Sequence, residues 1–163
     1  MTRRRAFRTL SGLGLVLALL SAPGCATGGG RTISELHLFG VPAALNLDPV
    51  PGPDGVGVRV YASDAGGTKG VAIRQGILEV LLYDGVVSPT AARTTPPLKV
   101  WSFNPTALKA YEGKTSLGAG YQFALKWAPE TPRQPVVTVV ARYRAPNGTA
   151  LWSAANTVTV SMK

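Results

Sequence analysis

Short runs of alternating apolar and polar residues, separated by turns rich in proline and glycine, recur about every ten residues through most of the chain. Residues 120–127 show the pattern most clearly, because every second residue from Tyr121 to Trp127 is large and apolar. Successive side chains of a strand point to opposite faces of its sheet, so these residues share one face. Runs this short and this frequent predict an all-β domain with very little helix.

We expect seven to nine strands, drawn from residues 33–39, 56–62, 71–75, 76–83, 98–103, 120–127, 136–143, 150–153 and 157–162. This number and spacing favour an antiparallel β-sandwich over a small closed barrel. In general shape such a sandwich resembles immunoglobulin-like or transthyretin-like domains, although it lacks the cysteine pair of true immunoglobulin domains. Asn104 and Pro105 predict the start of one short helix over residues 106–111, followed by a turn at residues 112–118.

The first 24 residues have the composition of an export signal. Arg3, Arg4, Arg5 and Arg8 precede an apolar run at residues 10–20 that is shorter than the roughly 20 residues a membrane-spanning helix needs. The pair Arg4-Arg5 followed by Ala6-Phe7 resembles the core of twin-arginine export signals. An ordinary Sec signal with an arginine-rich start is the alternative.

Small residues then lead to Cys25, the only cysteine of the chain. The stretch Leu20-Ser21-Ala22-Pro23-Gly24-Cys25 resembles the lipobox of bacterial lipoproteins. The resemblance implies a diacylglyceryl group on the Cys25 thiol, cleavage before it and acylation, for example with palmitate, of the new amine. An incidental cysteine behind an ordinary signal is the alternative. Residues 25–31 would form a flexible tether, and residues 32–163 the β-sandwich domain.

The membrane, reached through the lipid anchor at Cys25, is therefore the first expected partner. Ala26 follows the cysteine where an Asp would signal retention in the inner membrane, which favours the outer membrane facing the periplasm. The formal net charge is +9, but without the four arginines of the signal it is 13 basic against 8 acidic residues, or +5. This mild excess favours anionic envelope surfaces and falls short of a nucleic-acid-binding signature.

Residues suited to catalysis are scarce. His37 is the only histidine, it lies in an expected strand, and no Gly-x-Ser-x-Gly motif is present. Asn46, Asp48 and Asp54 could converge on a calcium ion, but Asp beside Pro or Gly more often stabilises a turn. We therefore expect a protein that is not an enzyme and needs no metal or cofactor.

Aromatic and basic residues are the best ligand-binding candidates. Trp101, Trp127 and Trp152, with Tyr121 and Phe123, could form a platform for a sugar or a peptide, and the alternative is that they belong to the core. Lys126, Arg142 and Arg144 could form a basic stripe on an outer sheet face, and a solvated face is the alternative. The loops at residues 88–97 and 128–135 are further places where recognition could occur.

A second resemblance concerns the first third of the domain. Leu45-Asn46-Leu47-Asp48, a Pro/Gly turn and then Val58-Arg59-Val60-Tyr61 are similar to the opening of the outer-membrane lipoprotein of type VI secretion systems. That family is a small lipidated β-sandwich that recruits an inner-membrane partner. The expected function is a membrane-anchored envelope lipoprotein that binds or scaffolds an unidentified ligand. The alternatives are a secretion-system assembly lipoprotein, with an envelope protein as partner, and a carbohydrate-binding module.

Overall fold

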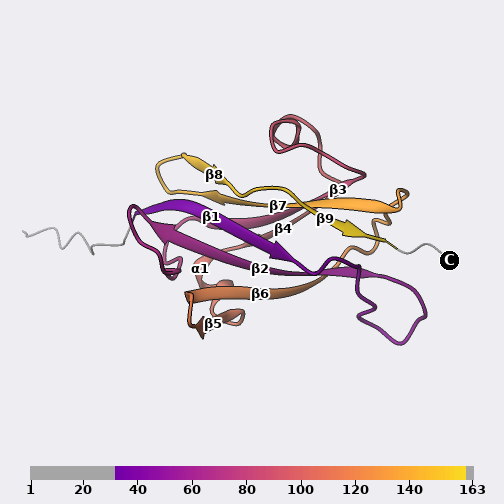
Figure 1. The fold of residues 1–163 in the computed structure, drawn as a ribbon, viewed down its shortest axis with the longest axis horizontal. Coiled ribbons are helices and arrows are strands. Elements are labelled where there is room, and N and C mark those ends of the chain that lie inside the picture. The colour runs from indigo at the N-terminus through magenta and orange to yellow at the C-terminus, as the bar shows by residue number, and fades with distance from the viewer. Residues whose placement is uncertain (1–31, 161–163) are drawn as a thin grey trace, which may run out of the picture.

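The computed structural model describes residues 32–160, which form two antiparallel sheets packed face to face (Figure 1). The nine strands within this range are β1 (Ile33–Gly40), β2 (Gly55–Asp64), β3 (Ile77–Asp84), β4 (Lys99–Phe103), β5 (Glu112–Thr115), β6 (Gly118–Lys126), β7 (Val136–Arg144), β8 (Ala150–Trp152) and β9 (Asn156–Thr159). A short helix, α1 (Pro105–Leu108), and a 3-10 helix at Ala91–Arg93 complete the elements. The expected all-β sandwich is confirmed.

The order of the strands in the two sheets can be compared with that of immunoglobulin domains. The first sheet runs β1-β2-β6-β5, and the second runs β4-β3-β7, with β8 and β9 both paired to β7. Immunoglobulin domains place their first, second, fifth and fourth strands in one sheet. The first sheet here has the same order if β4, which extends the second sheet, is left out of the count. The last strand of the second sheet is divided into β8 and β9, which both pair with β7.

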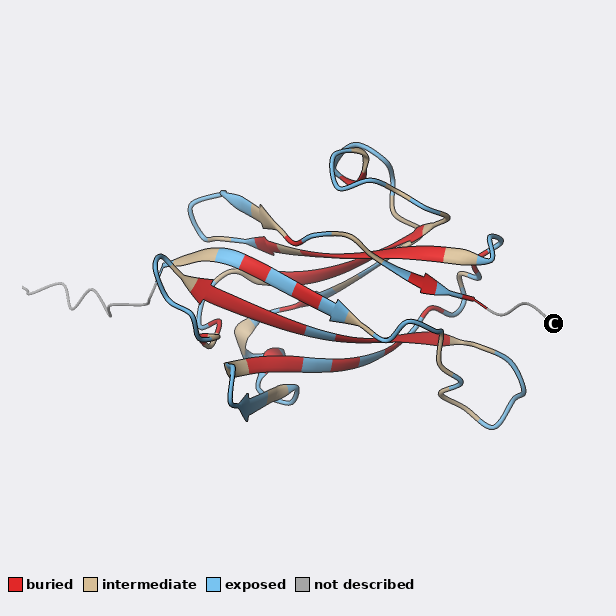
Figure 2. Ribbon diagram, in the orientation of Figure 1, coloured by how far each residue is buried: buried red, intermediate tan, exposed pale blue. Residues whose placement is uncertain are grey.

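The core lies between the sheets and is built from the alternating residues (Figure 2). Val56, Val58 and Val60 of β2 contribute from the first sheet, together with Tyr121, Phe123 and Leu125 of β6 and Trp127 just after it. Leu78, Val80 and Leu82 of β3 meet them from the second sheet. Because each strand places every second residue inward, one apolar face of each sheet is removed from water. Tyr121 contributes a further polar link, since its hydroxyl accepts a 2.6 Å hydrogen bond from Ile73 N.

A second, smaller apolar cluster covers part of the outer face of the second sheet. Leu81, Tyr83 and Val140 point away from the main core and pack against Ala92 of the 3-10 helix. The Tyr83 hydroxyl donates a 2.6 Å hydrogen bond to Ala92 O, which holds the β3–β4 loop on the sheet. This explains why nearly all of β3 is buried although only half of its residues face the main core.

The segment after β1 closes one side of the sandwich. Leu45 N donates to Gly55 O at 2.8 Å in the first sheet, while Ala44 N donates to Thr159 O at 2.8 Å beside β9. The adjacent residues Ala44 and Leu45 thus form backbone hydrogen bonds to opposite sheets. This arrangement places Val41 and Leu45 on the outer side of β2, where Gly57 leaves room for their side chains.

Several expected boundaries are wrong. Residues 71–75 form no strand but only a bridge between Val71 and Ala62, and residues 112–118 form β5 and its turn instead of a turn alone. The helix ends at Leu108, although its cap is as expected, since Asn104 Oδ1 accepts a 2.9 Å hydrogen bond from Ala107 N. The expected loop at residues 88–97 contains the 3-10 helix.

The export signal, Cys25 and the expected tether lie outside the described residues, as do the last residues of the expected final strand. Within residues 32–160, no helix has the length and apolar character needed to span a bilayer.

Candidate functional site

The three tryptophans do not share a surface. Trp127 is 3% exposed and belongs to the main core, so it cannot take part in a surface platform. Trp101, on the inner face of β4, packs against the same core and donates a hydrogen bond to Lys126 O at 3.2 Å. Trp152 packs on the smaller cluster at the outer face of the second sheet. Tyr121 and Phe123 are buried, so the expected aromatic platform is replaced by core packing.

The expected basic stripe does not form either. Arg142 and Arg144 lie on the outer face of the second sheet, where both contact the buried carboxylate of Glu79, at 2.5 Å and 2.9 Å. Arg142 also lies over the ring of Trp152, 5.0 Å from its centroid. Lys126 belongs to the first sheet and contacts Asp48 at 2.9 Å and Asp54 at 3.3 Å. Acidic residues therefore neutralise the cations in two separate networks.

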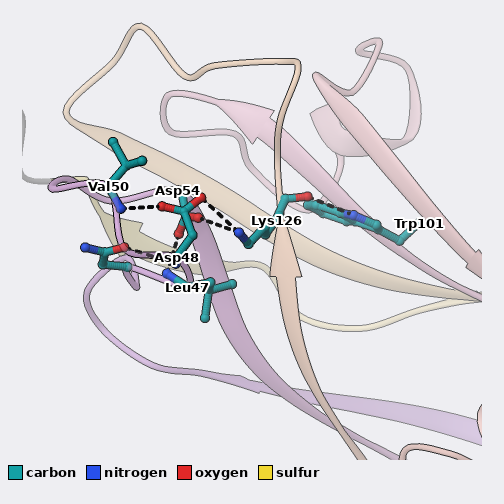
Figure 3. A network of polar contacts seen from close by, with 7 residues as sticks. Leu47, Asp48, Val50, Asp54, Trp101 and Lys126 are labelled. Atoms are coloured by element: carbon teal, nitrogen blue, oxygen red, sulfur yellow. Dashed lines mark hydrogen bonds and ion pairs between the residues drawn. The ribbon is translucent and has the colours of Figure 1, made fainter.

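The turn interpretation holds for Asn46, Asp48 and Asp54 (Figure 3). Asn46 Oδ1 accepts from Asp48 N at 3.2 Å, and Asp48 Oδ1 accepts from Val50 N at 2.9 Å. The Lys126 ammonium occupies the position between the two carboxylates that a cation would take. Its hydrogen bond lowers the pKa of Asp48, and the same bond raises the pKa of Lys126. No group of three or more metal-ligating side chains occurs within residues 32–160.

His37 lies on the exposed face of β1, and its Nε2 is 3.4 Å from Glu35 Oε2. The two side chains are 48% and 68% exposed, so water surrounds both. A general base in an enzyme works from a cleft in which its partner groups converge. The position of His37 therefore fits an ordinary strand surface residue.

A concave surface lies on the outer face of the first sheet. It encloses about 790 Å³ and extends from Val41 and Leu45 across β2 and β6 to Leu117. We call it the first-sheet groove. Four of its apolar residues are exposed to water, namely Phe39 at 56%, Leu117 at 55%, Val41 at 43% and Tyr111 at 36%. Contiguous exposed apolar side chains in one hollow are typical of an interaction surface.

Glycine creates the depth of the groove. A Cβ at Gly57 would lie 2.9 Å from side-chain carbons of both Val41 and Leu45, so glycine allows these two side chains to lie over β2. Further along, the rings of Phe39 and Tyr61 pack edge to face with centroids 6.0 Å apart. Tyr61 is 5% exposed beneath Phe39, which leaves one face of Phe39 open to a ligand.

One polar pair lies within this apolar surface. Arg59 of β2 donates a 2.8 Å hydrogen bond to Gln122 Oε1 of β6, directly across the sheet. No carboxylate within residues 32–160 forms an ion pair with Arg59, whereas Glu112 at the far side of the groove is held by Arg74 at 2.8 Å. The groove therefore combines exposed apolar side chains with a cation and an amide, which suits an apolar ligand carrying acceptor groups.

Sequence reasoning missed this groove. Phe39 is the last residue of an expected strand, and Val41 lies just beyond it in the turn-rich stretch that follows. A usable signal is the adjacent pair Leu38-Phe39, because neighbouring strand residues point to opposite faces and cannot both face one core. Gly57, in a strand of valines, is a second signal, because glycine inside a strand indicates close approach of another group.

Comparison with known protein families, with curated proteins and with solved structures finds no match to this chain.

Proposed function

We propose that the chain is an exported bacterial lipoprotein, held in the cell envelope by lipid on Cys25, whose sandwich binds a protein partner through the first-sheet groove. The anchor rests on the basic, apolar and small-residue order before the single cysteine. Residue 26 is alanine, which favours the outer membrane facing the periplasm. Two or three acyl chains give stable anchoring, whereas a single chain binds only marginally.

The observation that carries the binding proposal is the exposure of Phe39 and Val41 in the groove. Placing these side chains in water has a free-energy cost that contact with another apolar surface would remove. Protein interfaces typically have an aromatic anchor in a desolvated centre with a few hydrogen bonds around it. Phe39, beside the Arg59–Gln122 pair, has this arrangement. The partner would present apolar side chains and a carbonyl or carboxylate for Arg59.

A binding role is also supported by the way the acidic side chains are used. Glu79 is held by two arginines, Asp84 Oδ1 accepts from the backbone N–H groups of Arg133 and Gln134, and Lys99 contacts Glu130. Asp48 and Asp54 are held by Lys126. Carboxylates bound in this way stabilise the fold and its loops. None of these five carboxylates lines the groove, as a general acid or base would, and Glu112, which does line it, is held by Arg74.

A role in secretion-system assembly is the narrower form of this proposal. Leu45, Arg59 and Tyr61 belong to the residues on which the similarity to the type VI lipoprotein rests, and all three line the groove. A carbohydrate-binding role has less support, since Trp127 is buried and the other two tryptophans lie on different faces of the second sheet.

The anchor is tested by metabolic labelling with palmitate in the native bacterium. We expect label in the wild-type protein and none in Cys25→Ala, with the variant leaving the membrane fraction or remaining uncleaved. Equal incorporation in both proteins would contradict the anchor. Mass spectrometry of the N-terminal peptide checks the same point without radiolabel.

The groove is tested by crosslinking in intact cells, followed by pull-down and mass spectrometry. A photocrosslinking residue at Phe39 should capture one protein, and the double variant Phe39→Ser/Val41→Ser should lose that protein in pull-downs. The matched control is Val50→Ser/Val86→Ser, which removes two valines that are 67% and 76% exposed outside the groove. Equal recovery from both double variants would contradict the groove as the binding site.

A further inference from the structure

The five lysines within residues 32–160 divide into two groups. Lys126 is held by Asp48 and Asp54, and Lys99 is held by Glu130. Lys69, Lys109 and Lys114 are exposed and form no ion pair with any residue in this range. Lys126 ends β6 and Lys99 begins β4, whereas Lys109 follows α1, Lys114 belongs to β5 and Lys69 lies in the loop after β2. The segments that carry the last three lie at the opposite end of the sandwich from the end of β6 (Figure 1).

The three unpaired lysines lie at the end where β1 begins. Gly70 N donates to Leu117 O at 2.6 Å and Ala119 N donates to Gly70 O at 2.9 Å, so the loop carrying Lys69 is bonded to the β5–β6 turn. Lys109 and Lys114 line one shallow hollow together with Arg74. Arg74 also lines a neighbouring hollow with Thr32, the first described residue.

An apolar side chain projects among these lysines. Leu117 is 55% exposed at the β5–β6 turn, and all residues from Gly113 to Ser116 are exposed as well. The acidic residues at this end are Glu35, Asp64 and Glu112; Glu112 is paired with Arg74, and Glu35 lies beside His37 on β1. We call the surface formed by Lys69, Lys109, Lys114 and Leu117 the basal surface. Cations around a protruding apolar residue are suited to the boundary between lipid headgroups and acyl chains.

We propose that the basal surface rests on an anionic phospholipid bilayer, with the three lysines on the headgroups and Leu117 in the interfacial region. This inference rests on the proposed lipid anchor at Cys25. Residues 26–31 alone separate Cys25 from Thr32, which limits the distance between the two to about 24 Å when fully extended. Anionic lipid attracts nearby lysines, and the attraction decays within about a Debye length, so a short tether keeps these residues in range.

Docking on the basal surface would fix the orientation of the domain. The strands would point away from the membrane, because the basal surface lies at one end of the sandwich and the strands of both sheets run from that end to the other. The end carrying Val50 and Val86 would face away from the bilayer. The Phe39 end of the first-sheet groove would remain open to a partner in the periplasm, while Leu117 marks its membrane-proximal end.

The test uses the full chain, purified from membranes and reconstituted into vesicles of phosphatidylglycerol and phosphatidylethanolamine or of phosphatidylcholine alone. An environment-sensitive fluorophore is attached to Leu117→Cys or, as the distal control, to Val86→Cys. We expect a blue shift and quenching by spin-labelled lipid at position 117 in anionic vesicles, at least threefold greater than at position 86. Equal quenching at the two positions would overturn the proposal.

Charge variants distinguish an effect of the basal lysines from an effect of the net charge of the protein. Lys109→Glu/Lys114→Glu should remove most of the signal at position 117. Arg93→Glu/Arg133→Glu changes the net charge equally, at exposed positions of the other end, and should leave the signal unchanged. An equal loss in both double variants, or no loss in either, would contradict the proposed contact.

Thiol titration of the denatured wild-type protein distinguishes failure of the anchor from failure of this inference. A lipidated Cys25 is a thioether and does not react, whereas a free thiol at Cys25 would contradict the anchor. In that event the fluorophore positions are introduced into the Cys25→Ser chain, and flotation with excess anionic vesicles measures the basal surface alone. Binding that does not depend on Lys109 and Lys114 would then overturn the inference.

Discussion

Arg142 Nε lies 2.5 Å from Glu79 Oε2, and the Glu79 carboxylate is 4% exposed although it lies on the outer face of a sheet. Arg144 reaches the other oxygen of the same carboxylate at 2.9 Å, and Ser102 Oγ is 3.4 Å from it. The side chains on the neighbouring strands β4 and β7 thus cover a charge at the centre of the second sheet. Removing a partner of a buried charge is costly, whereas replacing the whole pair is not.

Arg142→Met should therefore reduce the free energy of unfolding by about 3 kcal/mol, because it leaves the Glu79 charge with one partner. Arg144→Met should cost less, since the Arg144 side chain is 53% exposed and the one of Arg142 is 26% exposed. The double variant Glu79→Met/Arg142→Met should recover most of the loss. Urea unfolding measures all three, and a double variant less stable than Arg142→Met would contradict this account.

The two glycines Gly118 and Gly148 should respond very differently to alanine. Both have positive φ, +97° and +86°, so alanine at either position carries a conformational cost of about 1 kcal/mol. A Cβ at Gly118 would also lie 2.4 Å from Gly70 O, whereas a Cβ at Gly148 would meet nothing within 4 Å. We expect Gly118→Ala to cost at least about 2 kcal/mol more than Gly148→Ala. Similar unfolding midpoints for the two would contradict the close approach of Gly70.

The free energy of unfolding should decrease in acid, because Asp48 and Glu130 become protonated. A hydrogen bond from Lys126 lowers the pKa of Asp48 from its ordinary 3.8, and one from Lys99 lowers the pKa of Glu130 from its ordinary 4.5. A carboxylate whose pKa is lower in the folded state stabilises the fold above its unfolded pKa, and this contribution is lost as the pH falls through the folded pKa. Stability should therefore begin to decline below about pH 4.5 and decline further below 3.8.

The matched variant for this pH dependence is Lys99→Met/Lys126→Met. Without the two ammonium groups, the pKa values of both carboxyls move back toward their unfolded values, so stability should change less between pH 5 and pH 2.5 than in the wild type. Urea midpoints measured across this range provide the comparison. A variant with the same acid dependence as the wild type would show that other carboxyls are responsible.

Trp127 and Trp152 should differ in what they contribute to stability. Trp127 is in the main core, so Trp127→Ala should cost about 3–5 kcal/mol of unfolding free energy. Trp152 is half-buried and lies beneath Arg142, so Trp152→Ala should cost about 1–2 kcal/mol. Differential scanning calorimetry gives both values. A larger loss of unfolding free energy for Trp152→Ala than for Trp127→Ala would contradict this prediction.

The strands of the core were predictable because their alternation is regular. Residues 120–127 and 56–62 have their large side chains on the faces that the pattern predicts, and both lie in the core. The Asn104 cap was predictable for a similar reason, since a side-chain oxygen followed by proline is a local signal. β5 was not predictable, because Glu112 to Thr115 has no apolar alternation. It forms through backbone pairing with β6 and the contact between Glu112 and Arg74.

The ligand-binding candidates were harder to predict, because a residue type does not reveal which neighbours surround it. Trp127 has the chemistry of a binding residue and is buried, while Phe39 resembles a core residue and is exposed. Lys126, Arg142 and Arg144 look like a basic stripe, but each meets a carboxylate from a strand or loop distant in sequence. Pairing across a sheet joins residues that are far apart in the chain.

The sequence alone determined the fold class, the inward faces of the main strands and the expectation of a lipid anchor, because alternation, turns and signal segments are encoded by neighbouring residues. Tertiary structure decided which apolar residues remain in water, which charges are neutralised and which loops share an end. Those properties depend on strand order and register, which bring Val41 over Gly57, Arg142 to Glu79 and the loop of Lys69 to Leu117. The first-sheet groove and the basal surface therefore exist only in the folded chain.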